Sequence, residues 1–336
     1  MGDSSKSVGV TTQVFRGRET RLTLQEVQVK ADQIVVEVEK AIVGKKDTIQ
    51  KCVATLLCNG HVLLEDIPGV GKTTLAKAIA KAIGGEFRRV QFTPDLLPSD
   101  VTGTLFYNQG QSSFEFRPGP IFGNVVLADE INRATPKTQS SLLEAMEERQ
   151  VTTDGETRKL PLPFFVIATQ NNLEMTGTYP LPEAQLDRFF ARLSLGYPDR
   201  VSEVRVLSEQ RLGIPLDEVN VIVNPTILLE MQAAVREVFV KPNVQEYIVD
   251  VVRATRESSQ LLMGASPRGS LHLMRASQAR AAMVGSDFVL PDHVKEMAVA
   301  VLAHRVIGRA ELRAQGISPV QVIQKILETV PTPVPN

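Results

Sequence analysis

Residues 61–75 read His61-Val62-Leu63-Leu64-Glu65-Asp66-Ile67-Pro68-Gly69-Val70-Gly71-Lys72-Thr73-Thr74-Leu75. The segment opens with a short apolar run typical of a buried parallel strand, turns through two glycines and continues with apolar residues along one helical face. A glycine turn between a strand and a helix directs backbone N–H groups at a phosphate, and the helix N-terminus adds a positive field. The segment therefore predicts a phosphate-binding loop.

Side chains within this loop suggest separate roles. Lys72 would reach the β- and γ-phosphates of a nucleotide, and the Thr73 hydroxyl would bind Mg²⁺. The usual motif has glycine where this chain has Asp66, and Pro68-Gly69 would supply the tight turn instead. A chance Gly-Lys-Thr triplet is the alternative, which the flanking strand and helix disfavour. The candidate nucleotide-binding residues are Pro68, Gly69, Val70, Gly71, Lys72, Thr73 and Thr74.

The composition is that of an ordinary folded protein. The chain has 336 residues, enough for two domains, with 43% apolar and 22% charged residues. Its 37 basic and 38 acidic residues balance, which disfavours a nucleic-acid partner. No apolar run approaches the roughly 20 residues that span a bilayer, and residues 1–20 lack the apolar core of a signal peptide. We expect a cytoplasmic protein whose two cysteines, Cys52 and Cys58, are small buried hydrophobes.

A second apolar run ends in two acids. Residues 125–128 predict a buried strand, and Asp129 and Glu130 follow at its carboxyl end, where parallel α/β sheets bind ligands. There Asp129 would hold Mg²⁺ through water, and Glu130 would accept a proton from the attacking water or polarise it. The alternative is an acid pair that caps a helix.

Three further polar residues each allow two interpretations. Asn171 follows a buried strand at 164–169, and it could position water beside the γ-phosphate or belong to a turn. Arg188 could be an ion-paired surface residue or an arginine finger offered to a phosphate. Arg268 lies in the first turn of a helix, where a cation opposes the helix dipole. That local cost makes sense if Arg268 points across a domain interface at a phosphate.

The order of the patterns predicts an α/β core followed by a helical domain. About five buried parallel strands alternate with helices, and β-hairpins interrupt them at 104–122 and 150–160. The first hairpin is either a plain surface hairpin or a device that projects towards a pore or client. We expect a disordered tail at 1–20, the core at 21–214, a linker at 215–224 and an all-helical lid at 225–332, in which no strand returns. Lid helices are expected near 225–238, 244–258, 268–284, 291–307 and 318–329.

Five segments together resemble the MoxR family of AAA+ ATPases. They are Glu65–Thr73, Leu127–Ala134, Glu144–Thr152, Thr178–Phe189 and Gly264–Arg268. The resemblance implies a P-loop AAA+ core with a five-stranded parallel sheet and hairpin inserts, followed by a helical lid. It also implies that Val43-Gly44 flanks adenine. The matching catalytic positions are Lys72 and Thr73 for Walker A, Asp129 and Glu130 for Walker B, Asn171 for sensor 1, Arg188 for the trans-acting finger and Arg268 for sensor 2.

The resemblance further implies an ATP-driven, hexameric, chaperone-like machine. Such machines mature or activate other protein complexes, often with partners that carry a von Willebrand factor A domain. Lys72, Mg²⁺ and Arg268 would then neutralise the triphosphate, while Arg188 of the next subunit would complete the site. A P-loop kinase, a DNA-acting AAA+ motor and a magnesium-chelatase-type subunit are the alternatives. ATP consumption without an acceptor would exclude the kinase, and salt-dependent DNA binding would favour the motor.

Overall fold

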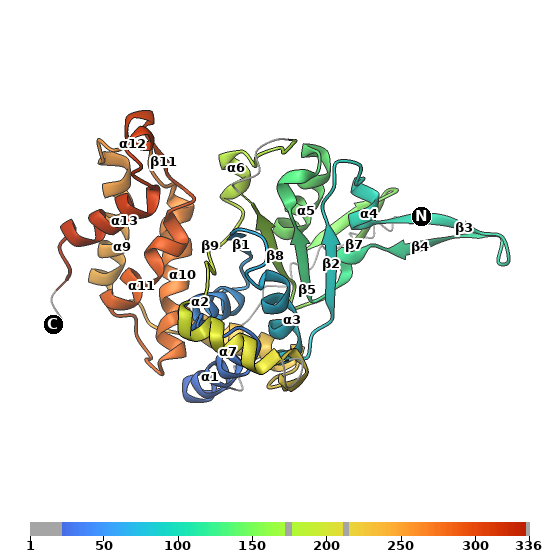
Figure 1. Cartoon of the computed structure of the whole chain (residues 1–336), viewed down its shortest axis with the longest axis horizontal. Coiled ribbons are helices and arrows are strands. Elements are labelled where there is room, and N and C mark those ends of the chain that lie inside the picture. The colour runs from blue at the N-terminus through green and yellow to red at the C-terminus, as the bar shows by residue number, and fades with distance from the viewer. Residues whose placement is uncertain (1–21, 172–176, 211–214, 334–336) are drawn as a thin grey trace, which may run out of the picture.

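A five-stranded parallel sheet forms the centre of the molecule in the computed structural model, which describes residues 22–171, 177–210 and 215–333 (Figure 1). Its strands are β1 (Val62–Glu65), β2 (Phe87–Gln91), β5 (Val125–Asp129), β8 (Phe165–Gln170) and β9 (Ala191–Leu193). Their order is β2-β5-β8-β1-β9, so β1 lies between β8 and β9, and every neighbouring pair is parallel. The prediction of about five buried parallel strands is confirmed.

Successive residues along each strand point to opposite faces of the sheet, because the side-chain period of a strand is two residues. Leu63 points to the face that α4 (Pro98–Thr102) and α5 (Pro136–Glu148) cover. Val62 and Leu64 point to the other face. The helices on that face are α1 (Leu24–Ala41), α2 (Lys46–Leu57) and α3 (Lys72–Ala82).

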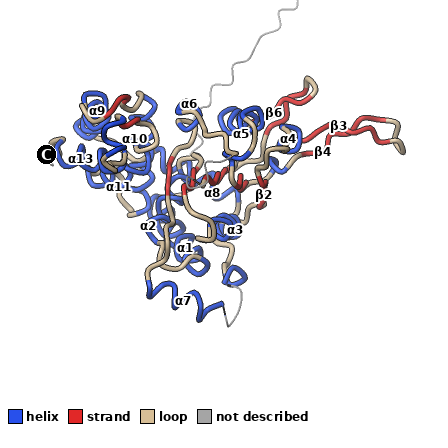
Figure 2. The backbone as a smooth tube through the Cα atoms, turned by 45° about the horizontal axis from the view of Figure 1, so that its top comes forward, coloured by secondary structure: helices blue, strands red, loops and turns tan. Residues whose placement is uncertain are grey.

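Two antiparallel hairpins leave the core where the sequence predicts them. The first pairs β3 (Gly103–Asn108) with β4 (Ser113–Pro118), and it extends well beyond the body of the molecule in Figures 1 and 2. The second pairs β6 (Gln150–Thr153) with β7 (Glu156–Lys159). Its turn residues Asp154 and Gly155 have φ values of 53° and 80°, the left-handed conformation that a two-residue hairpin turn favours.

The C-terminal part is almost wholly helical. Each of its five long helices begins with a proline in the first turn, where the missing N–H costs nothing. They are α8 (Pro225–Arg236), α9 (Pro242–Glu257), α10 (Pro267–Met283), α11 (Pro291–Leu302) and α13 (Pro319–Thr329), with the short α12 (Ala310–Ala314). The five predicted helices are therefore confirmed, although the fourth ends five residues early.

The expectation that no strand returns in the lid is wrong. Strand β10 (Leu261–Met263) pairs antiparallel with β11 (Ile307–Gly308). Strands of three and two residues are too short to show the alternation by which a strand is recognised in sequence. Strand β11 begins five residues after α11 ends at Leu302.

The segment predicted as a linker is packed against the core. Helix α7 (Arg200–Gln210) precedes it, and a 3₁₀ turn covers Pro215–Glu218. Val219 and Val223 are buried, and the Ile222 N–H donates to the carbonyl of Ala82. Because one apolar core continues from the sheet into the lid helices, the division at 215–224 stays a prediction.

The predicted tail at 1–20 lies outside the described residues. The remaining elements are α6 (Glu183–Leu186) and 3₁₀ turns at Pro120–Phe122 and Ile131–Arg133.

Candidate active site

The predicted phosphate loop lies at the carboxyl end of strand β1, which runs between β8 and β9. Gly69 and Gly71 have φ values of 85° and 95°, which glycine adopts without strain. A Cβ on Gly69 would meet nothing within 4 Å, so backbone conformation rather than crowding selects glycine there. Helix α3 begins at Lys72, which places Thr73 and Thr74 in its first turn. The loop therefore presents a glycine turn, a cation and two hydroxyls at one helix N-terminus.

Lys72 is partly buried beside the acidic residues of the site. Its ammonium donates to the backbone carbonyl of Asp66 at 2.8 Å. Burial lowers the pKa of Lys72, while the nearby carboxylates of Asp66, Asp129 and Glu130 oppose that shift. Lys72 therefore lies close enough to Asp129 and Glu130 for their charges to act on its ammonium, as the two motifs together predict.

Asp66, the departure from the usual motif, anchors the phosphate loop. Its carboxylate accepts hydrogen bonds from the Ser194 hydroxyl at 2.9 Å and from the backbone N–H groups of Leu195 and Gly196. The Asp66 N–H donates to the carbonyl of Gln170. A carboxylate that accepts several donors is a stronger tether than glycine could provide. Sequence reasoning treated Asp66 only as a mismatch and missed this role.

The acid pair is held by neighbouring strands. The Asp129 carboxylate accepts from the Thr169 hydroxyl at 2.6 Å and from Arg89 at 2.7 Å. Glu130 has a φ of 56°, an unusual conformation for a residue with a side chain. Its N–H donates to the Thr169 hydroxyl, and its carboxylate accepts from Gln91 and Arg133, each at 2.9 Å.

Sequence reasoning also missed Arg89, Gln91 and Thr169. A signal for Gln91 was present, because it is the last residue of a strand that runs parallel to β5. The register pairs Gln91 with Asp129, so the polar ends of two adjacent strands meet at one edge of the sheet. The left-handed conformation of Glu130 has no counterpart in the sequence pattern.

Asn171 completes this edge of the sheet. It is buried and follows β8, the strand between β5 and β1, and its carbonyl accepts from the Asn132 amide at 3.5 Å. Asn171 therefore lies between the strand that ends in Asp129 and the strand that leads to Lys72. Asn172, the next residue, lies outside the described residues.

The turn at Val43-Gly44 lies beside the phosphate loop. A Cβ built on Gly71 would approach the Ile42 side chain to 3.1 Å, so the two segments are adjacent. Gly44 has a φ of 75°, and a Cβ there would lie 2.1 Å from the Ser202 hydroxyl of α7. The structure thus brings the expected adenine-flanking residues next to the expected phosphate site.

Arg188 and Arg268 lie at the opposite edge of the sheet from the phosphate loop, where the parallel strands begin. Arg188 precedes β9, whose Ala191 pairs with Val62 at the start of β1. Both arginines bind Glu147 near the end of α5, through Arg188 Nε at 3.3 Å and Arg268 Nη2 at 2.9 Å. The structure therefore does not bring Arg268 to Lys72 of its own chain, contrary to the expectation that the two would neutralise one triphosphate together. The order of residues in a sequence could not reveal this, because α10 begins beside α5 only after the lid has folded.

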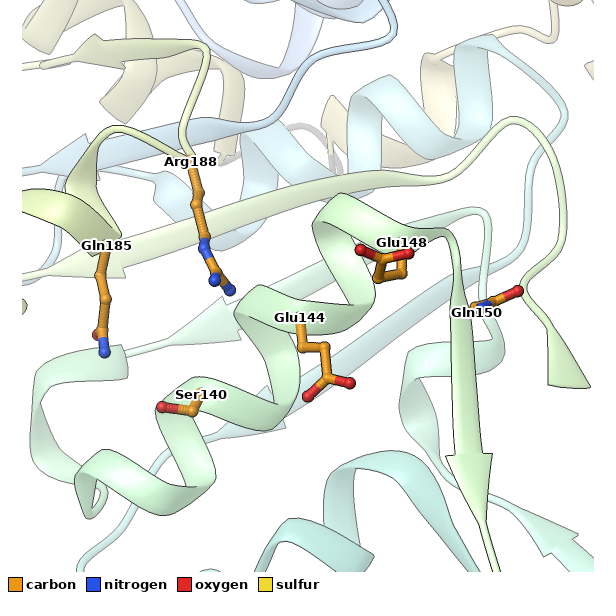
Figure 3. Close-up of a pocket in the computed structure, with 6 residues that line it drawn as sticks. All are labelled: Ser140, Glu144, Glu148, Gln150, Gln185 and Arg188. Atoms are coloured by element: carbon orange, nitrogen blue, oxygen red, sulfur yellow. The ribbon is translucent and has the colours of Figure 1, made fainter. Parts of the chain in front are cut away.

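Two hollows adjoin these arginines. One, of about 260 Å³, is lined by Arg188 and Arg268 with Arg149, Arg275 and the residues that precede β1. The other, of about 470 Å³, is shown in Figure 3, where Arg188 reaches towards the acidic face of α5. Its lining residues are Ser140, Glu144, Glu148, Gln150, Gln185 and Arg188. The lining of the first hollow includes four arginines but only two acids, Glu147 and Asp187. This excess of positive charge makes the hollow suited to an anion.

Comparisons with known proteins identify the family. Residues 61–191 match the family described as ATPase family associated with various cellular activities (AAA), and residues 253–326 match the AAA lid domain. The chain is 49% identical over 300 residues to the uncharacterized protein YeaC of Bacillus subtilis (strain 168), covering 89% of this chain and 94% of that protein. It is 42% identical over 314 residues to Chaperone MoxR1 of Mycobacterium tuberculosis, covering 91% and 83%. The chain belongs to the MoxR family of AAA+ ATPases.

A solved structure agrees with this MoxR-family assignment. A crystal structure from Cytophaga hutchinsonii ATCC 33406, described provisionally as an ATPase, superposes with a TM-score of 0.86 at 41% identity. It covers 93% of this chain and 97% of that one. The protein is thus an ATPase with an α/β AAA+ core and a helical lid. Within the part of the chain that is described, no helix has the length and apolar character needed to cross a bilayer.

The carboxyl edge of the sheet in this MoxR-family ATPase suits a magnesium nucleotide. Asp129 is a buried carboxylate at the position where oxygen ligands are needed, and Thr73 supplies a hydroxyl in the first turn of α3. Lys72 supplies a positive charge, and the open space at Gly69 leaves room for a ligand against the loop backbone. These residues could hold the nucleotide and its metal.

Proposed function

We propose that this ATPase hydrolyses ATP to ADP and phosphate at a site shared by two protomers of a ring, which we take to be a hexamer. One protomer would contribute Lys72 and Thr73 together with Asp129, Glu130 and Asn171. The next protomer would contribute Arg188 and Arg268. The nucleotide would also contact Pro68, Gly69, Val70, Gly71, Thr74, Val43 and Gly44.

One observation carries the proposal: the arginines lie at the opposite edge of the sheet from Lys72. Within one chain, Arg188 and Arg268 bind a carboxylate on α5 and line a hollow beside the residues that precede β1. In a ring with head-to-tail interfaces, each protomer contacts its two neighbours through two different faces. The arginine edge of one protomer can therefore lie against the phosphate-loop edge of the next. Arg268 would then act, like Arg188, on the nucleotide of the adjoining protomer rather than on its own.

Phosphoryl transfer asks the protein mainly for positioning and charge stabilisation. Lys72 would bind the β- and γ-phosphates, and Glu130, which Gln91 and Arg133 hold in place, would orient the attacking water with help from Asn171. Mg²⁺, held by Thr73 and through water by Asp129, would neutralise charge on the phosphate oxygens. Because an arginine finger contributes roughly 10³–10⁵-fold in rate, isolated protomers should be nearly inactive.

A mixing experiment tests the shared site. Glu130→Gln and Arg188→Ala protomers are each expected to be inactive alone, and mixed rings should recover ATPase activity. Recovery is expected because some interfaces then pair an intact Glu130 with an intact Arg188. The control mixes Glu130→Gln with Lys72→Ala, in which every phosphate site is damaged and no activity should return. Absence of recovery in rings shown to contain both variants would rule out a site that two protomers share.

The cellular role belongs to the same proposal. We infer that the ring is a cytoplasmic chaperone-like machine that matures or activates another protein complex, together with a partner that carries a von Willebrand factor A domain. The name of the mycobacterial relative, a chaperone, supports this role. So do the aromatic residues exposed along the β3–β4 hairpin, Phe106, Tyr107 and Phe114, which could meet a client. The net charge of −1 gives nucleic acid no support as the client.

Co-purification tests this role. The Glu130→Gln variant, loaded with ATP, should hold its partner longer than the wild type. A protein with a von Willebrand factor A domain should therefore be enriched on it in extracts of the native organism. Equal recovery on Glu130→Gln and on Lys72→Ala would show that capture does not depend on the nucleotide state, and would count against the chaperone-like cycle.

A further inference from the structure

Arg305, which follows helix α11 in the lid, is a buried cation outside the site described above. Its side chain is only 1% exposed. Its guanidinium donates to the Asp187 carboxylate at 2.8 Å and to the backbone carbonyls of Asp187, Phe189 and Phe190 at 3.2, 2.7 and 3.2 Å. All of these acceptors belong to residues 187–190, the segment that carries Arg188 and leads into β9.

The hydrogen bonds of residues 187–190 show how this segment depends on the Arg305 side chain. The N–H groups of Arg188 and Phe189 donate to the preceding turn, and the N–H of Phe190 donates to the carbonyl of His61. The carbonyls of Asp187, Phe189 and Phe190 all accept from the Arg305 guanidinium, and the Phe189 carbonyl also lies 3.0 Å from Nε2 of the neighbouring His304. Buried backbone groups need partners, so the conformation of this segment depends on that guanidinium.

The same contacts join the segment to the lid. Arg305 also contacts the His272 imidazole of α10 at 2.6 Å, and that ring stacks on Phe190 with 4.8 Å between centroids. Four residues before His272, Arg268 lies 3.6 Å from the other carboxylate oxygen of Asp187. A movement of α10 or α11 relative to the sheet would therefore move residues 187–190.

We propose, on the basis of the shared site above, that Arg305 is a positioning residue: it fixes residues 187–190 so that Arg188 reaches the nucleotide of the adjoining protomer. Arg305 itself does not touch the nucleotide. It acts through the segment that it holds, and it couples the position of the lid to the position of the finger. A guanidinium suits this task because its planar fork offers several donors at once, whereas a lysine offers a single ammonium at the end of a flexible chain.

Substitution Arg305→Lys tests the proposal with the positive charge retained. We expect kcat to fall about 100-fold, the effect of misplacing a catalytic group by roughly 1 Å. The affinity for nucleotide, measured by titration with a fluorescent ADP analogue, should change less than about 2-fold, because Lys72 and the phosphate loop lie at the other edge of the sheet. A parallel loss of kcat and nucleotide affinity would instead mean general damage to the fold and would overturn the proposal.

Mixed rings give a readout that a purely structural role would not reproduce. Arg305→Lys protomers retain an intact phosphate site, so they should restore activity to Glu130→Gln protomers. They should not restore activity to Arg188→Ala protomers, because both variants then lack a working finger. Recovery in the second mixture, or failure of the first where Arg188→Ala with Glu130→Gln recovers, would overturn the role of Arg305 alone. If Arg188→Ala with Glu130→Gln also fails, the shared site falls and the role of Arg305 falls with it.

A second variant keeps the test decisive if Arg305→Lys does not fold. Asp187→Asn removes the charged partner of Arg305 and leaves the three carbonyl contacts in place. We expect a smaller loss of kcat with the same pattern in the two mixtures. Full activity of Asp187→Asn together with recovery in the Arg188→Ala mixture would contradict the proposal independently of Arg305→Lys.

Discussion

Glu147 of the core and Arg268 of the lid form an ion pair of 2.9 Å between helices α5 and α10. The second oxygen of the same carboxylate lies 3.3 Å from Arg188 Nε. One carboxylate thus keeps two guanidinium groups side by side at the edge of the sheet that faces away from the phosphate loop. It offsets their mutual repulsion and sets the direction in which both extend.

Glu147→Gln should impair catalysis more than stability. The Glu147 and Arg268 side chains are 40% and 44% exposed, so loss of the ion pair should lower the free energy of unfolding by no more than about 1 kcal/mol. The ATPase rate of assembled rings should fall, because neither guanidinium keeps its anchor. Glu257→Gln breaks an exposed ion pair with Arg253 far from the site and serves as the control. An unchanged ATPase rate would mean that Glu147 does not orient the arginines.

Asp66→Ala should loosen the phosphate loop. The substitution leaves the Ser194 hydroxyl and the N–H groups of Leu195 and Gly196 without their acceptor. We expect a loss of about 1–3 kcal/mol in the free energy of unfolding from chemical denaturation, with weaker nucleotide binding. Asp66→Asn keeps one acceptor oxygen, so its free energy of unfolding should lie between those of the wild type and Asp66→Ala. Wild-type stability in Asp66→Ala would show that the tether has no energetic role.

Gly44→Ala should displace helix α7 and weaken nucleotide binding. The new methyl would lie 2.1 Å from the Ser202 hydroxyl, and the φ of 75° would cost an L-residue roughly 1–2 kcal/mol. Adding Ser202→Gly removes the clash but not the backbone strain, so the double variant should recover part of the nucleotide affinity lost in Gly44→Ala. No recovery would mean that the contact with Ser202 is not the cause of the defect.

Acid should destabilise the lid through His272. Burial, with help from Arg305, Arg268 and Arg275, lowers the pKa of His272 to about 3 from its ordinary 6.5. The unfolded chain therefore binds more protons between those values, so stability is present above pH 6.5 and is lost as the pH falls. One such group changes the free energy of unfolding by at most about 1.4 kcal/mol per pH unit.

The comparison of wild type with His272→Gln isolates this effect. Glutamine can accept a hydrogen bond from Arg305 but does not titrate, while the other acid-sensitive groups are common to both proteins. Between pH 7 and pH 4.5, the free energy of unfolding should therefore fall more steeply in the wild type. Equal slopes would show that His272 takes up no extra proton on unfolding.

Local patterns were sufficient to predict the sheet, the phosphate loop and most lid helices. The loop could be predicted because its strand, glycine turn and helix are contiguous, and Asp129 and Glu130 because they end an apolar strand. The proline starts of the lid helices are equally local signals. The short ribbon β10–β11 escaped prediction because strands of two and three residues carry no periodicity.

The amino-acid order alone was enough to establish that this chain holds a nucleotide-type loop in an α/β core, because each motif is written in consecutive residues. It could not establish which edge of the sheet each arginine occupies. Glu147, Arg188, Arg268 and Arg305 come from four separate segments of the chain, and their distances depend on how the lid packs against the sheet. The carboxylates and carbonyls that hold these arginines come together only when that packing is complete, since ion pairs and hydrogen bonds act over a few ångströms.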